Sequence, residues 1–178
     1  MTVIVRETKE TQVRVELTRG GGPAAADTGR PLLDHMMVTL CRYAGLGLTL
    51  GARGDLKHHL IEDVAIAFGE AIQALAQDPI ARYGDRLVAM DDALVQVAVD
   101  LGGRPYYLGP LPSALYDHWM RSFSDHAGAT LHLSVLRGHD RHHVVEAAFK
   151  ALGLSLREAL APSDAVFSTK GAVKQEKR

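Results

Sequence analysis

Two short segments, HHLIED at residues 58–63 and HHVVEA at residues 142–147, decide the fold because they are near copies of each other. The similarity continues on both sides of these segments in the same order along the chain. The further matching pairs are residues 12–17 with 96–101, 34–37 with 117–120, and 44–45 with 127–128, at offsets of 84, 83 and 83. Chance is a poor explanation for four ordered matches, so the sequence predicts an internal duplication.

Each half predicts the same succession of strands and helices. QVRVEL (12–17) and QVAVDL (96–101) alternate apolar and polar residues, which is typical of half-buried strands, and a second short strand is expected after each. Apolar residues at helical spacing, ended by glycine, then predict a helix, which is followed by another strand and an amphipathic helix. The predicted helices cover residues 32–45, 58–76, 114–128 and 142–160, and the later strands cover 46–54 and 129–138.

The predicted fold class is α+β, with β-β-α-β-α halves and helices on one face of the sheets. We expect the whole chain of 178 residues to form one domain, with halves of about 1–80 and 81–165 and a tail at 166–178. GGGPAAADTG (20–29) is predicted to be a loop or hairpin with a flexible tip, and residues 78–91 are predicted to link the halves.

Charge and cysteine content exclude several classes of protein. The formal net charge is −1, with acidic and basic residues interspersed, so we expect neither a nucleic-acid partner nor a membrane surface. The basic end, KGAVKQEKR, is expected to be a solvated terminus apart from Lys170. One cysteine, no signal-peptide pattern and no long apolar run together predict a cytoplasmic protein.

The repeated histidines have the spacing of metal ligands. On a helix, His58 and Glu62 lie four residues apart and face the same way, whereas His59 points about 100° away. The second half repeats this arrangement at an equivalent triplet, and the aligned first helices add one histidine each. The candidate ligands are His35, His58, His59, Glu62, His118, His142, His143 and Glu146. This donor set suits Mn, Fe, Co, Ni or Zn rather than Ca or Mg.

The simplest symmetric division of these ligands serves two metal ions. One ion would take His58, Glu62, His118 and His143, and the other His142, Glu146, His35 and His59. Because adjacent histidines face apart, these sets need not close within one chain, and they predict a link between metal binding and assembly. The remaining histidines, His126, His132 and His139, are interpreted as packing or surface residues.

Several motifs resemble the imidazoleglycerol-phosphate dehydratase family. They are RETKET (6–11), TGRPLLDHMM (28–37), the two His-His segments, MDDAL (90–94), DLGGRP (100–105) and STKG (168–171), in the family's order along nearly the whole chain. The resemblance implies a duplicated fold like domain 2 of ribosomal protein S5. It also implies dehydration of imidazoleglycerol phosphate to imidazole-acetol phosphate in histidine biosynthesis. The expected partners are this substrate and further copies of the chain in a 24-mer, with two Mn²⁺ ions per active site at subunit contacts.

The family's functional positions fall on residues of suitable chemistry. The metal positions coincide with the eight candidate ligands above, and the acid/base position falls on Glu10 in TKET. The phosphate-binding positions fall on Arg82, Arg104, Lys150, Ser168 and Lys170. Guanidinium, ammonium and hydroxyl groups together suit a phosphate monoester dianion. At the offset of 84, Glu10 aligns with Leu94, so we expect Glu10 to lack a counterpart in the second half.

The chain departs from the family pattern at a few positions, and two other functions remain open. Thr39 replaces a common glutamine, Asp92 replaces a glutamate, and the segment before His58 is shorter. One alternative is a paralogue that acts on another phosphorylated substrate at the same metal site. The other is a non-catalytic metal-binding assembly, against which Glu10 and the complete phosphate-binding set argue.

Overall fold

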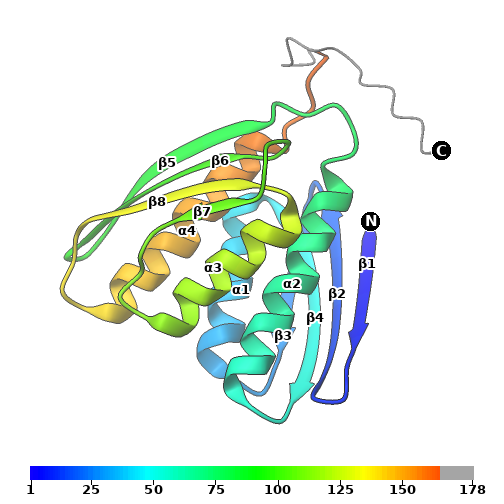
Figure 1. The fold of residues 1–178 in the computed structure, drawn as a ribbon. Coiled ribbons are helices and arrows are strands. Elements are labelled where there is room, and N and C mark those ends of the chain that lie inside the picture. The colour runs from blue at the N-terminus through cyan, green and yellow to red at the C-terminus, as the bar shows by residue number, and fades with distance from the viewer. Residues whose placement is uncertain (165–178) are drawn as a thin grey trace.

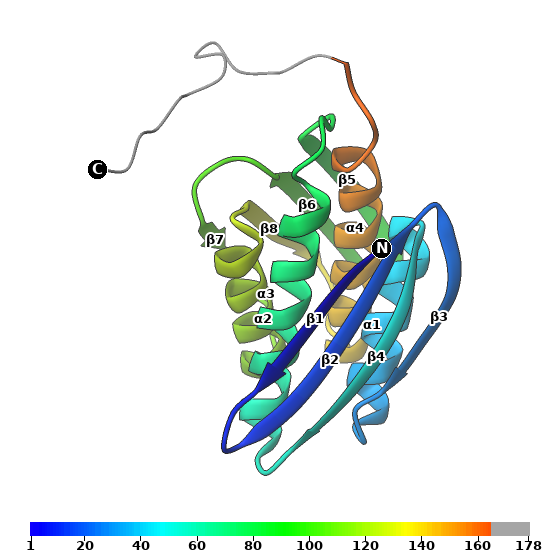
Figure 2. The same ribbon diagram turned by 90° about the vertical axis from the view of Figure 1, so that its right-hand side faces the viewer.

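The computed structural model describes residues 1–164 and contains two four-stranded sheets with four helices between them (Figures 1 and 2). Ser168 and Lys170 lie outside the described residues. The elements follow the duplicated order that the sequence predicts, and the α+β class is confirmed. Within the described residues, no helix is long and apolar enough to cross a membrane.

The first sheet and its helices form the N-terminal half. The sheet has the order β1-β2-β4-β3, in which β1, β2 and β4 are antiparallel neighbours and β3 runs parallel to β4. Its elements are β1 (Thr2–Glu7), β2 (Thr11–Arg19), β3 (Gly21–Asp27), α1 (Pro31–Ala44), β4 (Leu46–Gly54) and α2 (Lys57–Leu75).

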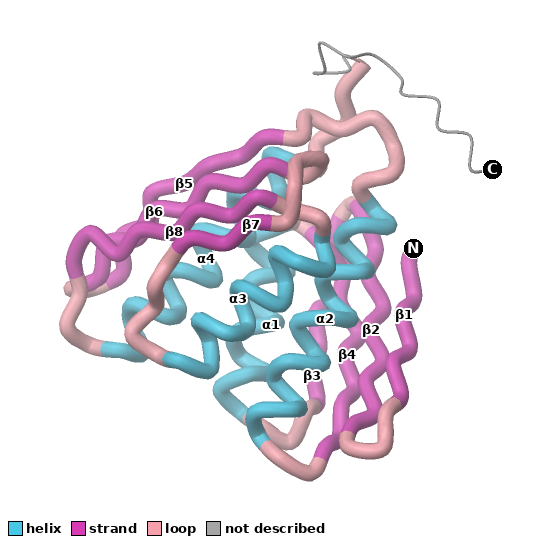
Figure 3. Tube along the Cα trace, in the orientation of Figure 1, coloured by secondary structure: helices cyan, strands magenta, loops and turns pink. Residues whose placement is uncertain are grey.

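The second half repeats this topology. Its sheet has the order β5-β6-β8-β7, again with an antiparallel trio and a parallel edge strand. Its elements are β5 (Tyr83–Met90), β6 (Ala93–Asp100), β7 (Tyr106–Leu108), α3 (Ala114–Ala127), β8 (Thr130–Arg137) and α4 (Arg141–Ala159). Figure 3 shows the two sheets on opposite sides of the helices.

Two local predictions were wrong. Most of residues 20–29 form strand β3, because the backbone from Ala24 onward pairs with β4 and only its glycine-rich start is irregular. Most of the expected link at 78–91 is strand β5, which pairs along its length with β6. Strand β1 likewise adds to β2, so each half has one more strand than predicted.

The helices lie where the sequence places them. Helices α1 and α3 end at Gly45 and Gly128, whose φ angles of 68° and 61° are left-handed. A glycine adopts this conformation without the steric cost of a Cβ atom, so these two residues terminate the helices as predicted. The order α1, β4, α2 of the first half therefore recurs as α3, β8, α4 in the second half.

Each helix packs against a helix of the other half, with α1 against α4 and α2 against α3. A Cβ at Gly69 of α2 would lie 2.8 Å from the Phe123 carbonyl oxygen, and a Cβ at Gly153 of α4 would lie 2.5 Å from that of Leu40. These two glycines are 84 residues apart, so the duplication preserves both close crossings. Buried aromatic residues fill the centre between the helices, notably Phe68, Trp119, Phe123 and Phe149.

Candidate metal centre

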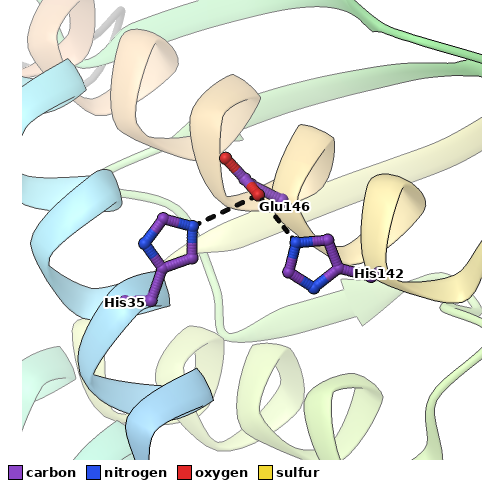
Figure 4. Close-up of side chains that lie close together, drawn as sticks. All are labelled: His35, His142 and Glu146. Atoms are coloured by element: carbon purple, nitrogen blue, oxygen red, sulfur yellow. Dashed lines mark ion pairs between the residues drawn. The ribbon is translucent and has the colours of Figure 1, made fainter.

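The crossing of α1 and α4 brings together three candidate ligands, His35, His142 and Glu146, which we name the α1–α4 cluster. Glu146 Oε2 lies 3.2 Å from His35 Nε2 and 3.1 Å from His142 Nε2 (Figure 4). The two imidazole rings are nearly parallel, with centroids 6.3 Å apart. Both rings are half exposed whereas Glu146 is buried, so the carboxylate forms the floor of an open site.

The crossing of α2 and α3 brings together the equivalent residues His58, Glu62 and His118, which we name the α2–α3 cluster. Glu62 places one carboxylate oxygen 3.3 Å from His118 Nε2 and the other 3.7 Å from His58 Nε2. The two imidazoles stack with centroids 4.8 Å apart. Both clusters therefore contain a His–Glu pair from the second helix of one half and one histidine from the first helix of the other.

The chemistry of these clusters suits a divalent transition metal. In each cluster, one ligand atom from every residue lies within 4.8 Å of the others, and the donors are imidazole nitrogens and a carboxylate oxygen. The Nε2 atom of His118 is buried and makes no hydrogen bond within the described residues, although Glu62 lies nearby. A buried ring nitrogen without a hydrogen bond is a costly arrangement that a metal ion would satisfy.

The two clusters differ in their charged surroundings. Lys150 Nζ lies 3.0 Å from Glu146 Oε1, the carboxylate oxygen that faces away from the histidines. The residue equivalent to Lys150 in the first half is Ile66, so α2 carries no lysine one turn after Glu62. Burial raises the pKa of Glu146, but hydrogen bonds from Lys150 and His35 outweigh it and lower the pKa overall. The α1–α4 cluster therefore holds its glutamate ionised and fixed in orientation.

His59 and His143 join neither cluster within one chain. His59 Nδ1 lies 3.0 Å from Asp55 Oδ1, and His143 Nδ1 lies 2.8 Å from Asp92 Oδ1. These hydrogen bonds raise the pKa of both histidines. A carboxylate at one ring nitrogen is the usual way in which a protein orients the other nitrogen toward a metal. Both imidazoles are thus held by a carboxylate and lie outside the two clusters of their own chain.

The asymmetry expected for Glu10 needs correction. Glu10 Oε2 lies 3.3 Å from His59 Nδ1, at the turn between β1 and β2. At the corresponding turn between β5 and β6, Asp91 and Asp92 lie 3.6 and 2.8 Å from the ring nitrogens of His143. Acidic side chains therefore accompany the outer histidine in both halves, and Leu94 is not the spatial counterpart of Glu10. The alignment at offset 84 missed this because the two hairpin turns differ in length.

Among the described residues, the predicted phosphate-binding side chains lie in two separate places. Lys150 adjoins the α1–α4 cluster, but Arg82 and Arg104 lie at the opposite end of the second sheet, where Arg82 pairs with Asp100 at 2.6 Å. The Arg82 amide donates to Ala159 at the last turn of α4, about 25 Å along the helix from His142. Arg82 also has a left-handed φ of 75°, a conformation that is uncommon for a non-glycine residue.

Sequence reasoning missed the carboxylates that support the ligands. Asp55 precedes His59 by four residues, and this helical spacing is a signal that could have been used. Asp92 is 51 residues from His143, and it also accepts hydrogen bonds from the His139 and Asp140 amides. These contacts, led by the His139 amide, lower the Asp92 pKa well below its usual range. The family's glutamate at this position is one methylene longer than Asp92.

A duplicated α+β chain with two histidine–glutamate clusters, each assembled from both halves, defines a class of candidate dinuclear metalloenzymes. Comparison with known proteins identifies the particular family. The family model described as imidazoleglycerol-phosphate dehydratase matches residues 28–156. Imidazoleglycerol-phosphate dehydratases from Pyrobaculum calidifontis and Desulfitobacterium hafniense are 49% and 44% identical, over 95% and 96% of this chain and 98% and 96% of theirs.

Solved structures agree with this match. The crystal structure of the dehydratase from Pyrococcus furiosus is similar with a TM-score of 0.86 and 37% identity, covering 96% of this chain and 100% of that one. The Staphylococcus aureus structure has a TM-score of 0.77 and 27% identity, with coverage of 92% and 100%. The chain belongs to the imidazoleglycerol-phosphate dehydratase family, whose members are hydro-lyases of histidine biosynthesis.

Proposed function

We propose that this chain catalyses the metal-dependent dehydration of D-erythro-imidazoleglycerol phosphate to imidazole-acetol phosphate. The observation that carries the proposal is the pair of His–Glu clusters built by crossed helices, in a chain nearly half identical to dehydratases of that name. The reaction removes a proton from C2 and the hydroxyl group from C3, and the resulting enol tautomerises to the ketone.

The residues that would hold the metal ions are the six cluster residues, with His59 and His143 as outer ligands. The donor set suits Mn²⁺ among several transition-metal ions, and the family resemblance favours Mn²⁺. When bound, such an ion supplies Lewis-acid polarisation of the substrate's imidazole and hydroxyl groups. The Asp55 and Asp92 carboxylates keep His59 and His143 in the orientation that presents Nε2 as a ligand atom.

Glu10 is the residue that we assign to movement of the C2 proton. Its side chain is half exposed and lies beside His59, so it can reach a substrate bound at the metal site without itself being enclosed. It would accept the C2 proton and later return it during tautomerisation.

The phosphate group is assigned to Arg82, Arg104, Lys150, Ser168 and Lys170. Because Arg82 and Arg104 lie far from the clusters of their own chain, a complete site requires residues from more than one copy. The outer position of His59 and His143 calls for the same arrangement. Both features support assembly into a closed homo-oligomer, the 24-mer of the family resemblance. We place the enzyme in the cytoplasm because its one cysteine, Cys41, is free and buried.

Turnover tests the proposal directly. The purified chain is loaded with Mn²⁺ and supplied with imidazoleglycerol phosphate, and the loss of one water is followed by mass spectrometry. We expect conversion that is abolished in His142→Ala and in His58→Ala, one variant for each cluster. Tight substrate binding by a metal-loaded, assembled protein without turnover would instead favour a paralogue with another phosphorylated substrate.

A further inference from the structure

A buried polar network joins the turn that carries Glu10 to helix α2. The Asp63 carboxylate accepts from Arg6 Nε at 2.7 Å through Oδ1 and from the Thr11 hydroxyl through Oδ2. Asp63 and Thr11 are both buried, and Arg6 is about one third exposed. Both oxygens of one buried carboxylate on α2 thus accept hydrogen bonds, one from a residue of β1 and one from a residue of β2. We name Arg6, Thr11 and Asp63 the carboxylate clamp.

The clamp continues into the turn itself. The Thr11 hydroxyl donates to Asp63, so the Thr8 hydroxyl donates to Thr11 Oγ1 across 3.1 Å. Thr8 Oγ1 accepts in turn from the Thr11 and Glu10 amides at 2.9 and 3.1 Å. The Glu10 carbonyl accepts from the Asp55 amide at 3.1 Å. Thr8 and Thr11 are therefore joined by hydrogen bonds across the turn, and the Glu10 backbone is held through both its amide and its carbonyl.

The clamp is attached to the same helix as the metal ligands. Asp63 follows Glu62 directly and lies one helical turn after His59, so a rigid helix connects the clamp with the α2–α3 cluster. The end of β4 packs closely on the turn as well, since a Cβ at Gly54 would lie 2.9 Å from Thr11 Cγ2. The backbone position of Glu10 relative to helix α2 is thus determined by these contacts.

The clamp is present in one half only. The residue equivalent to Asp63 at offset 84 is Ala147, which is fully buried and offers no acceptor. There the β5–β6 turn is held differently, through Asp92 and the amides of His139 and Asp140. The duplication preserved the ligands on both second helices but placed a buried carboxylate behind one of them.

We propose that Arg6, Thr11 and Asp63 are positioning residues that hold Glu10 at its proton-transfer position. The inference rests on the proposed role of Glu10 in dehydration. A carboxylate on an exposed turn without such support would lose effective alignment with the substrate. The clamp residues do not touch substrate; they act through the placement of Glu10.

The test compares steady-state kinetics of Thr11→Val, Thr11→Ser and Asp63→Asn in the metal-loaded assembly. Thr11→Val keeps the side-chain shape but removes the hydroxyl, and we expect kcat to fall roughly tenfold with KM, metal content and particle mass unchanged. Thr11→Ser, which restores the hydroxyl, should recover to within about twofold of wild type. Arg14→Met is the matched control, because Arg14 pairs with Glu16 on the outer face of the same strand. If Asp63→Asn fails to assemble, the kcat of Thr11→Val alone decides the test.

A double variant separates positioning from general stability. In the Glu10→Gln background, Thr11→Val should cause no further fall in kcat, because the group that it positions is already gone. An equal tenfold fall in that background would overturn the clamp proposal. The clamp proposal would also be overturned if Thr11→Val and Asp63→Asn had wild-type kcat while kcat of Glu10→Gln was reduced. Wild-type turnover in Glu10→Gln itself would overturn the role of Glu10 and the clamp with it, a result distinct from failure of the clamp alone.

Discussion

At the scale of single residues, equivalent positions in the two halves share chemistry but differ in their supporting contacts. Both outer histidines, His59 and His143, lie beside a carboxylate at Nδ1, yet Asp55 directly precedes the same helix whereas Asp92 comes from a turn distant in sequence. Repetition in the sequence therefore identifies the ligands. The supporting residues follow from where each hairpin turn ends, which differs between the halves.

Replacement of Glu10 by glutamine tests its role in proton transfer. Glutamine keeps the shape of the side chain but cannot accept a proton, and general acid–base catalysis contributes about 10²–10⁴-fold. We therefore expect turnover by Glu10→Gln to fall at least roughly a hundredfold, with metal stoichiometry, particle mass and substrate affinity near wild type. Turnover within about threefold of wild type would instead direct attention to Asp91, beside His143.

The pKa of His143 gives a prediction about pH. The hydrogen bond to Asp92 raises this pKa in the metal-free chain above the ordinary value of 6.5. The protonated form is therefore favoured in the folded protein. Its stabilising contribution is complete below about pH 6.5 and is lost as the pH rises through the folded-state pKa. Since a metal ligand must be neutral, protons should compete with metal over this window.

An NMR titration of the metal-free protein measures this effect. The His143 ring should titrate above pH 6.5, and Asp92→Asn should bring its midpoint down toward that value. A His143 midpoint below 6.5 in the wild-type chain would contradict the prediction.

At the scale of elements, the helices were predictable and some strands were not. All four helices begin and end within one residue of their predicted limits, because apolar periodicity and terminal glycines are local signals. The short strand expected after residues 12–17 was not located at β3, because its glycine-rich start resembles a loop, and β5 was missed because its recognition depends on pairing with β6. The six cluster residues followed from the repeat, but the carboxylate clamp depends on contacts 52 to 57 residues apart.

The close helix crossings predict the effect of adding a single methyl group. In Gly153→Ala, the new Cβ would lie 2.5 Å from the Leu40 carbonyl oxygen, so α1 and α4 must separate. Overpacking of this kind costs about 1–3 kcal/mol, and the free energy of unfolding should fall by that amount. Gly153 lies two turns beyond Glu146, so metal affinity of the α1–α4 cluster should also fall.

Chemical denaturation and metal titration of Gly153→Ala test these effects together. Gly51→Ala is the matched control, because a Cβ at Gly51 meets nothing within 4 Å. Equal stability of the two variants would show that α1 and α4 can separate without cost, against the packing described above.

At the scale of the whole molecule, the site is expected to be complete only in an assembly. Removal of metal with a chelator at neutral pH should convert the large particle to a smaller species, and Mn²⁺ should reverse the change. The reason is that His59 and His143 are oriented as ligands but join neither cluster of their own chain. Native mass spectrometry or light scattering measures the particle. An unchanged mass after complete metal removal would contradict the link, and His59→Ala should impair assembly even with Mn²⁺ present.

The crossed arrangement of helices also bears on how the chain arose. Neither half can close a cluster alone, because the first-helix histidine of one half meets only the His–Glu pair of the other. A single half made as a separate polypeptide would need a second copy, and two identical copies related by a twofold axis would close two identical clusters. The present chain is equivalent to such a dimer fused into one gene. Fusion allowed the copies to diverge, so that Lys150 in one half corresponds to Ile66 in the other, and Asp63 corresponds to Ala147. Two identical subunits cannot differ from each other in this way. An ancestral twofold symmetry was thereby adapted to a substrate that has none.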